Sequence, residues 1–119
     1  MFYSMRHDLP QEEIHDVLRN KRRRNVLSHL RKHVGDLTVR ELAEAIAEAE
    51  SGESPPPRNI RQSVYNSLHQ THLPKLDALD LIEYDTDRKT VSMKSKMRQV
   101  DVYMEFTTPY KLTWGEYYQ

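Results

Sequence analysis

The sequence contains no cysteine, only three glycines and no long hydrophobic run. Without cysteine, the chain has no disulfide, no thiolate ligand for zinc, and no thiol nucleophile or redox sensor. A glycine-rich phosphate loop, an HExxH metal motif and a nucleophile elbow are also absent. We therefore predict that the protein is not an enzyme and carries no cofactor.

Membrane and secretion signals are missing as well. No stretch approaches the roughly eighteen apolar residues of a membrane span. Met1 to His7 lack the apolar run of a signal peptide. We expect a soluble, cytoplasmic protein with no membrane partner and no small-molecule substrate.

The charges are balanced, with 18 basic and 18 acidic residues in a chain of 119. This length fits one domain of ordinary size. Because the net charge is zero, it argues neither for nor against a nucleic-acid partner. The distribution of charge along the chain has to decide.

Hydrophobic periodicity predicts two helices at the start of the chain. The first runs over residues 10–18, with a proline in its first turn. The second runs over residues 21–33, with Val34 facing inward and Gly35 ending the helix. Leu37 is expected to form a short strand.

Two further helices follow. Residues 38–41 form a capping box, and the apolar stripe of this helix extends to about Glu50. Residues 51–57 form a linker rich in Gly, Ser and Pro. The next helix begins near Arg58, and Pro74 is expected to kink or end it.

Alternating residues predict a hairpin, with strands over 81–84 and 90–93 and a polar turn between them. The spacing of Met97, Val100 and Met104 then favours a C-terminal helix. A strand is the alternative, but the other elements leave no sheet for it to join.

The order helix, helix, short strand, helix, helix, hairpin, helix is that of a winged helix. We predict a mainly α fold with a small β-hairpin: a winged helix-turn-helix over residues 9–94. An additional C-terminal helix and an aromatic tail occupy residues 95–119.

The polar face of the fourth predicted helix has the strongest functional signal. Residues 54–76 contain no acidic residue, which suits a surface near phosphates, whereas a plain solvated face usually carries Glu and Asp. Arg, Gln and Asn pair with base edges in the major groove. We predict that this face reads DNA bases. It comprises Arg58, Asn59, Arg61, Gln62, Tyr65, Asn66, His69 and Gln70.

Two other basic groups are candidates for phosphate contact. A basic run occupies the first turn of the second helix, where the helix dipole disfavours cations unless an anion is near. The alternative is pairing with Glu12, Glu13 and Asp16. At the hairpin turn, a wing could reach phosphate or the minor groove, or simply be solvated. The candidates are Lys21, Arg22, Arg23, Arg24, Arg88 and Lys89.

Two pairs of histidines have helical spacing, His29 with His33 and His69 with His72. No cysteine and no third ligand accompany them, so we predict no metal site. A histidine-based metal sensor is kept as the least favoured alternative.

Aromatic residues gather at the end of the chain. Burying each stabilises a protein by about 2–3 kcal/mol, so we expect them to be covered. They either pack on their own domain or form a subunit interface, which we favour because a small domain has little spare core. The predicted homodimer interface comprises Met97, Val100, Met104, Phe106, Trp114 and Tyr117.

Three segments resemble winged-helix domains abundant in haloarchaea: DVLRNKRRRNVL (16–27), VYNSLHQTHLPKLD (64–77) and IEYD (82–85). The resemblance extends through WGEYY (114–118), and the arginine run is similar in outline to ArsR-like repressors. It implies a winged-helix fold and DNA-binding regulation. The chain departs from the usual acidity of haloarchaeal proteins, which fits a DNA-binding role or a viral or plasmid origin.

We therefore predict an archaeal, sequence-specific regulator of transcription that binds double-stranded DNA as a homodimer. The alternative is a winged-helix protein-interaction module that docks a partner through its aromatic C-terminal segment.

Overall fold

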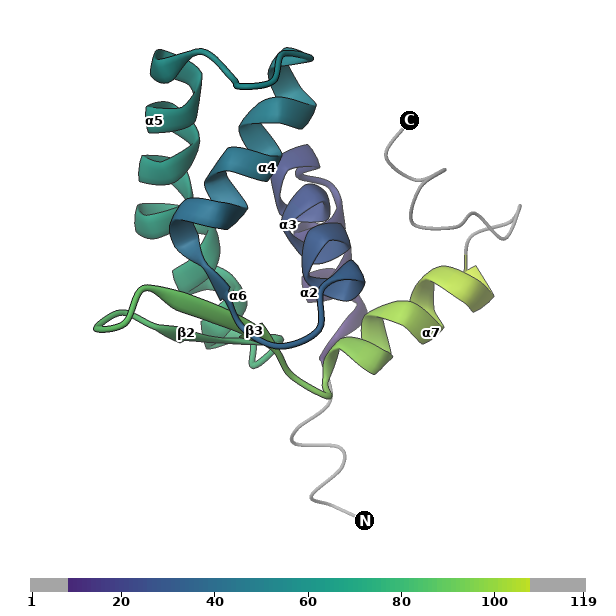
Figure 1. Ribbon diagram of the computed structural model, residues 1–119. Helices are drawn as coiled ribbons and strands as arrows, with labels where there is room; N and C mark the ends of the chain where they lie inside the picture. Colours follow the sequence, from purple (N-terminus) through teal and green to yellow (C-terminus); the bar gives the residue numbers. More distant parts are fainter. Residues whose placement is uncertain (1–8, 108–119) are drawn as a thin grey trace.

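The computed structural model describes residues 9–107, and side chains over residues 9–102. It is mainly helical, with a small three-stranded antiparallel sheet (Figure 1), as the sequence predicts. The elements are α2 (Gln11–Leu18), α3 (Lys21–Lys32), β1 (Leu37–Thr38), α4 (Val39–Ser51), α5 (Arg58–Ser67), η1 (Leu68–His72), α6 (Leu73–Ala78), β2 (Ile82–Asp85), β3 (Thr90–Met93) and α7 (Met97–Thr107).

Local capping explains where the helices begin and end. The Asn20 side chain accepts a hydrogen bond from the backbone of Arg23 and caps α3. Thr38 and Glu41 form the complete capping box predicted for α4. Gly52 ends α4 with a φ of 73°, a left-handed conformation that glycine adopts without steric penalty.

The helix that contains Pro74 continues through it. Upstream of the proline, Leu68–His72 forms a π turn in which the N–H of Leu73 donates to the carbonyl of Leu68. A proline ring clashes with the carbonyl four residues earlier in a regular α-helix, and a π turn changes that spacing. The sequence predicts that Pro74 kinks or ends the helix. The structure instead has a local widening of the helix at the π turn, and α6 follows directly.

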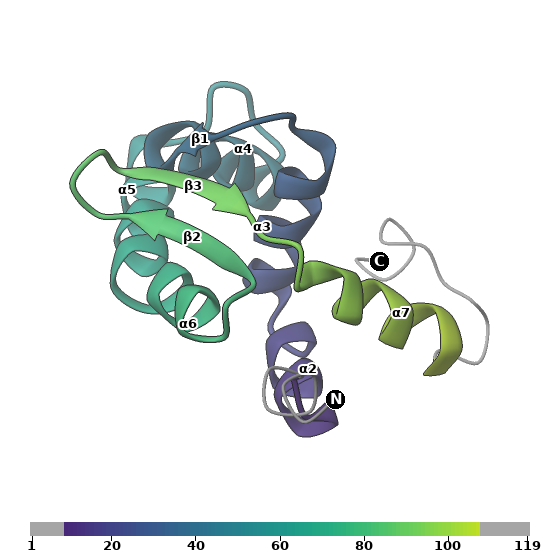
Figure 2. The same cartoon turned by 90° about the horizontal axis from the view of Figure 1, so that it is seen from below.

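The sheet has the order β1-β3-β2, with β3 in the middle. Val91 on β3 lies opposite Leu37 on β1 and opposite Tyr84 on β2, and all three are buried. The predicted hairpin and the short strand at Leu37 are confirmed. Figures 1 and 2 show α4 and α5 on one face of the sheet, while α7 extends away from it.

One hydrophobic core joins α2 through β3 to the start of α7. Val34, expected to face this core, is 98% exposed. Helix α3 ends at Lys32, His33 is extended, and Gly35 has a φ of 90°. The chain therefore turns away before Val34 reaches a helical position.

Helix α7 begins inside the same core. Met97 and Val100 are 2% and 0% exposed, and the Asp101 carboxylate lies 2.5 Å from the Arg31 guanidinium on α3. Burial in the chain's own core replaces the interface role expected for Met97 and Val100. The side chains of Met104 and Phe106, and the whole of Trp114 and Tyr117, lie outside the described residues.

Within residues 9–107, none of the helices combines the length and the apolar character that crossing a membrane requires.

Candidate nucleic-acid interface

Helix α5 packs on the domain by one side. Val64 is fully buried and Ile60 is partly buried against the core, so the opposite, polar side faces outward. Five of the eight predicted base-reading residues are exposed, four of them on α5 and one, Gln70, on η1 directly after it. They are Arg58, Asn59, Gln62, Asn66 and Gln70.

Two of these exposed residues form a pair. The Gln62 side-chain amide donates a 3.1 Å hydrogen bond to the Asn66 carbonyl oxygen, one turn further along the helix. The bond leaves the carbonyl oxygen of Gln62 and the amino group of Asn66 for another partner. An acceptor and a donor are the two kinds of group that adenine requires of a partner in the major groove.

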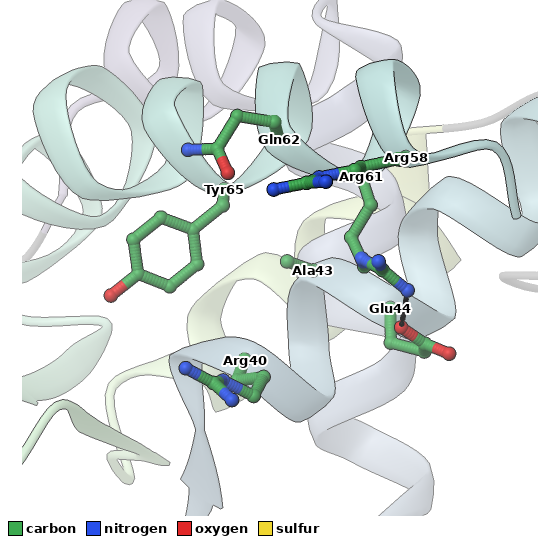
Figure 3. Close-up of a pocket in the computed structure, with 7 residues that line it drawn as sticks. All are labelled: Arg40, Ala43, Glu44, Arg58, Arg61, Gln62 and Tyr65. Carbon is green, nitrogen blue, oxygen red and sulfur yellow. Dashed lines mark hydrogen bonds and ion pairs between the residues drawn. The ribbon is translucent and has the colours of Figure 1, made fainter.

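A polar hollow of about 570 Å³ lies between α4 and α5 (Figure 3). Helix α5 supplies Arg58, Arg61, Gln62 and Tyr65, and helix α4 supplies Arg40, Ala43 and Glu44. The Arg61 guanidinium lies 3.3 Å from the Glu44 carboxylate, so Arg61 has an intramolecular partner.

Arg40 and Glu44 were not among the residues that the sequence singles out. Both lie on α4, whose apolar stripe tells which side is buried but not which neighbouring helix lies beside it. The signal available in the sequence is position. Glu44 follows the small Ala43 and Arg40 precedes it by three residues, so both lie near a point where another helix can approach closely.

His69 and Tyr65 are turned toward other side chains of the domain. The His69 ring nitrogen Nδ1 lies 2.6 Å from the Tyr84 hydroxyl oxygen, and the two rings meet edge to face. Tyr65 stacks on His69, with ring centroids 6.5 Å apart. Burial raises the pKa of the Tyr84 hydroxyl, which therefore stays protonated. These three rings connect the helix to strand β2.

Most of the arginine run is directed into the domain. Arg23 is 7% exposed, and its guanidinium donates to the backbone carbonyls of Asp16 and Val17. Arg24 donates to the carbonyl of Leu18 at 2.6 Å. These carbonyls end α2 and have no partner within their own helix. Cations that are unfavourable at the start of α3 are thus favourable at the negative end of α2.

Arg22 is paired with an acid far along the chain. Its guanidinium makes two 2.6 Å hydrogen bonds to the Glu50 carboxylate at the end of α4. The structure therefore gives Arg22, Arg23 and Arg24 intramolecular partners. Those partners differ from the acidic side chains considered as the alternative. Lys21 is exposed.

The hairpin turn presents Arg88 and Lys89 to solvent. The Asp85 carboxylate accepts hydrogen bonds from the backbone N–H groups of Asp87 and Arg88, both at 3.0 Å, and this shapes the turn. The carbonyl of Lys89 accepts from the N–H of Val39 at 2.9 Å. The turn is therefore attached to the first residue of α4.

The histidine pairs do not converge on a common point. His72 is buried, and its Nδ1 has no hydrogen-bond partner. Burial, and then the charges of Arg23 and Arg22, lower the pKa of His72 to about 4. Among the residues that the structure describes, no group of three or more potential ligands surrounds a metal position.

A family model described as a domain of unknown function, DUF7344, matches residues 15–92, well over half of the chain. The protein belongs to the DUF7344 family. The matched segment extends from α2 to β3, so it includes the polar face of α5, the hollow and the hairpin. No curated protein and no solved structure matches this DUF7344 chain.

Proposed function

We propose that this DUF7344 protein is a winged helix-turn-helix regulator of transcription that works in the cytoplasm and binds double-stranded DNA as a homodimer. In this reading α4 and α5 are the helix-turn-helix, and the β2–β3 hairpin is the wing. The observation that carries the proposal is the outward face of α5, which is polar, exposed and free of carboxylates.

Gln62 and Asn66 are the proposed base readers. Their hydrogen bond orders the two side chains before DNA arrives, so that less conformational entropy is lost on binding. Arg58, Asn59 and Gln70 lie along the same exposed face. A major groove about 12 Å wide admits such a helix.

The wing is the second proposed contact. Arg88 and Lys89 are exposed at its turn, and the Val39–Lys89 hydrogen bond attaches that turn to α4. The Tyr65–His69–Tyr84 ring contacts attach its strand to the α5 side. The wing and the helix would therefore meet DNA as one surface.

A homodimer would double these contacts and match a palindromic site, which a single module of this size reads weakly. With Met97 and Val100 in the core, the proposed interface is the outer side of α7 together with Met104, Phe106, Trp114 and Tyr117. The 47% exposure of Val102, an apolar residue on that side of α7, supports this assignment.

The alternative function is a protein-interaction module that docks a partner and binds no DNA. Exposed apolar side chains favour it, because Val34, Met93 and Val102 are 98%, 41% and 47% exposed.

Selection from a pool of random duplexes tests the proposal. The purified chain is incubated with the pool at moderate salt, and retained duplexes are sequenced after several rounds. We expect enrichment of one motif, arranged as an inverted repeat with half-sites about 34 Å apart. A pool that stays random, with no retention at low salt, contradicts DNA binding and favours the docking alternative.

A further inference from the structure

The hollow between α4 and α5 contains three guanidinium groups but only one carboxylate. Arg61 is paired with that carboxylate, Glu44. For Arg40 and Arg58, the described part of the chain provides no ion-pair partner, and both are exposed. Two helices thus direct unneutralised cations toward the same hollow.

The arginine run at the start of α3 is arranged differently. Arg22 is paired with Glu50, and Arg23 and Arg24 donate to carbonyls, so their charges have a structural purpose. Arg40 and Arg58 have no such contact. Like charges that line one hollow without a partner repel, and an anionic ligand relieves that repulsion.

The position of the hollow indicates which anion fits. Gln62, a proposed base reader, lines it, and Arg40 follows Val39, whose N–H is bonded to the wing at Lys89. Arg40 therefore lies between the helix that reads bases and the wing. A DNA backbone that passes from one to the other would cross the hollow, and guanidinium groups match phosphate oxygens in geometry and charge.

We infer that Arg40 and Arg58 bind phosphates of the DNA backbone in this hollow, and that Glu44 holds Arg61 back from a further phosphate contact. This inference rests on the proposed function. The Arg61–Glu44 pair is suited to such a restraint, because both side chains are about 40% exposed and an ion pair at that exposure is weak. By holding Arg61 away from phosphate, Glu44 lowers the affinity of the protein for a duplex of any sequence. Base contacts then contribute a larger share of the binding free energy.

Salt dependence tests the inference without knowledge of the operator. Binding of the full chain to a mixed-sequence 20-base-pair duplex is measured by fluorescence anisotropy over a range of salt concentrations. Each lost phosphate contact lowers the slope of log K against log salt by about 0.9. We expect this loss in Arg40→Gln and in Arg58→Gln, with binding largely retained in Arg40→Lys.

Glu44→Gln is expected to do the opposite. It frees Arg61, so the duplex binds more tightly and the slope steepens by about 0.9. Glu13→Gln, on an exposed position of α2, and Arg19→Gln, on the exposed residue that follows α2, are the matched charge controls.

The outcomes distinguish a failure of the phosphate contacts from a failure of DNA binding itself. If the Arg40 and Arg58 variants keep the slope of the Arg19→Gln control while wild-type protein binds duplex DNA, the inference is wrong and the proposed function stands. If Glu44→Gln behaves like Glu13→Gln, the restraint on Arg61 is wrong. If wild-type protein binds no duplex at low salt, both are overturned.

Discussion

The imidazole of His69, on the π turn η1 that follows α5, lies 2.6 Å from the hydroxyl of Tyr84 on strand β2. Asp77 supports the same strand by accepting the N–H of Tyr84 at 3.2 Å. These contacts set the orientation of the hairpin relative to the helix.

Tyr84→Phe is predicted to destabilise the protein by about 1 kcal/mol, because it removes one partly buried hydrogen bond while keeping the ring. Urea denaturation measures the change. A double-mutant cycle with His69→Ala gives the coupling, which we expect to be about 0.5–1.5 kcal/mol. Additive effects of the two substitutions would show that the contact does not join helix and wing.

Stability should fall in mild acid because of His72. Its folded pKa, about 4, is below the ordinary value of 6.5, so between these values the unfolded chain binds a proton that the folded chain does not. The full stability is present above pH 6.5, and about 3 kcal/mol is lost as pH falls to 4.

The comparison with His72→Leu isolates this effect. Wild type and variant are unfolded by urea at several pH values, and the difference in unfolding free energy should change through that window. His29, whose pKa burial also lowers, is present in both proteins and cancels. A difference independent of pH would mean that His72 is readily protonated in the fold.

Arg23→Met is predicted to destabilise the domain by about 2–4 kcal/mol, since it leaves two backbone carbonyls at the end of α2 without their charged donor. Thermal denaturation measures this. Lys21→Met, at the exposed first position of α3, should change stability by less than about 0.5 kcal/mol. The salt slope of DNA binding should be the same for Arg23→Met as for wild type. A reduced slope would restore Arg23 to the phosphate contacts.

Gln62→Ala and Asn66→Ala are each predicted to weaken binding to the selected duplex by about 1–3 kcal/mol. Both residues are exposed, so the unfolding free energy of each variant should equal that of the wild-type protein. Gel-shift titration compares them with Gln11→Ala, an exposed glutamine on α2. Unchanged affinity of both variants would remove α5 from the major groove.

Truncation after Thr107 keeps the buried start of α7 and removes the tail with Trp114 and Tyr117. We predict a folded chain that sediments as a monomer and binds the selected duplex much more weakly than the full-length chain, for which we propose a dimer. Truncation after Lys94 also removes Met97 and Val100 from the core, and deleting buried side chains of this size costs about 2–5 kcal/mol each. A full-length chain that is monomeric at micromolar concentration would contradict the dimer.

The sequence by itself was sufficient for features that depend on neighbouring residues. The capping box of α4, the two strands of the hairpin and the amphipathic face of α5 involve residues within a few positions of each other. The local sequence pattern is therefore sufficient to predict these features. Val34 is the local exception. An apolar residue at this position is compatible either with one more helical residue facing the core or with an exposed turn, and its neighbours in the sequence do not distinguish the two.

Only the tertiary structure decided the partners of the charged residues and the burial of α7. Arg22 meets Glu50 28 positions away, and the N–H of Leu9 meets the side chain of Gln99 90 positions away. Many acids and carbonyls are chemically equivalent partners for an arginine, and chain packing selects among them. For the same reason Arg40 and Arg58 line one hollow only because α4 lies beside α5. An apolar stripe in α7 serves a core or an interface equally well until its neighbours are known.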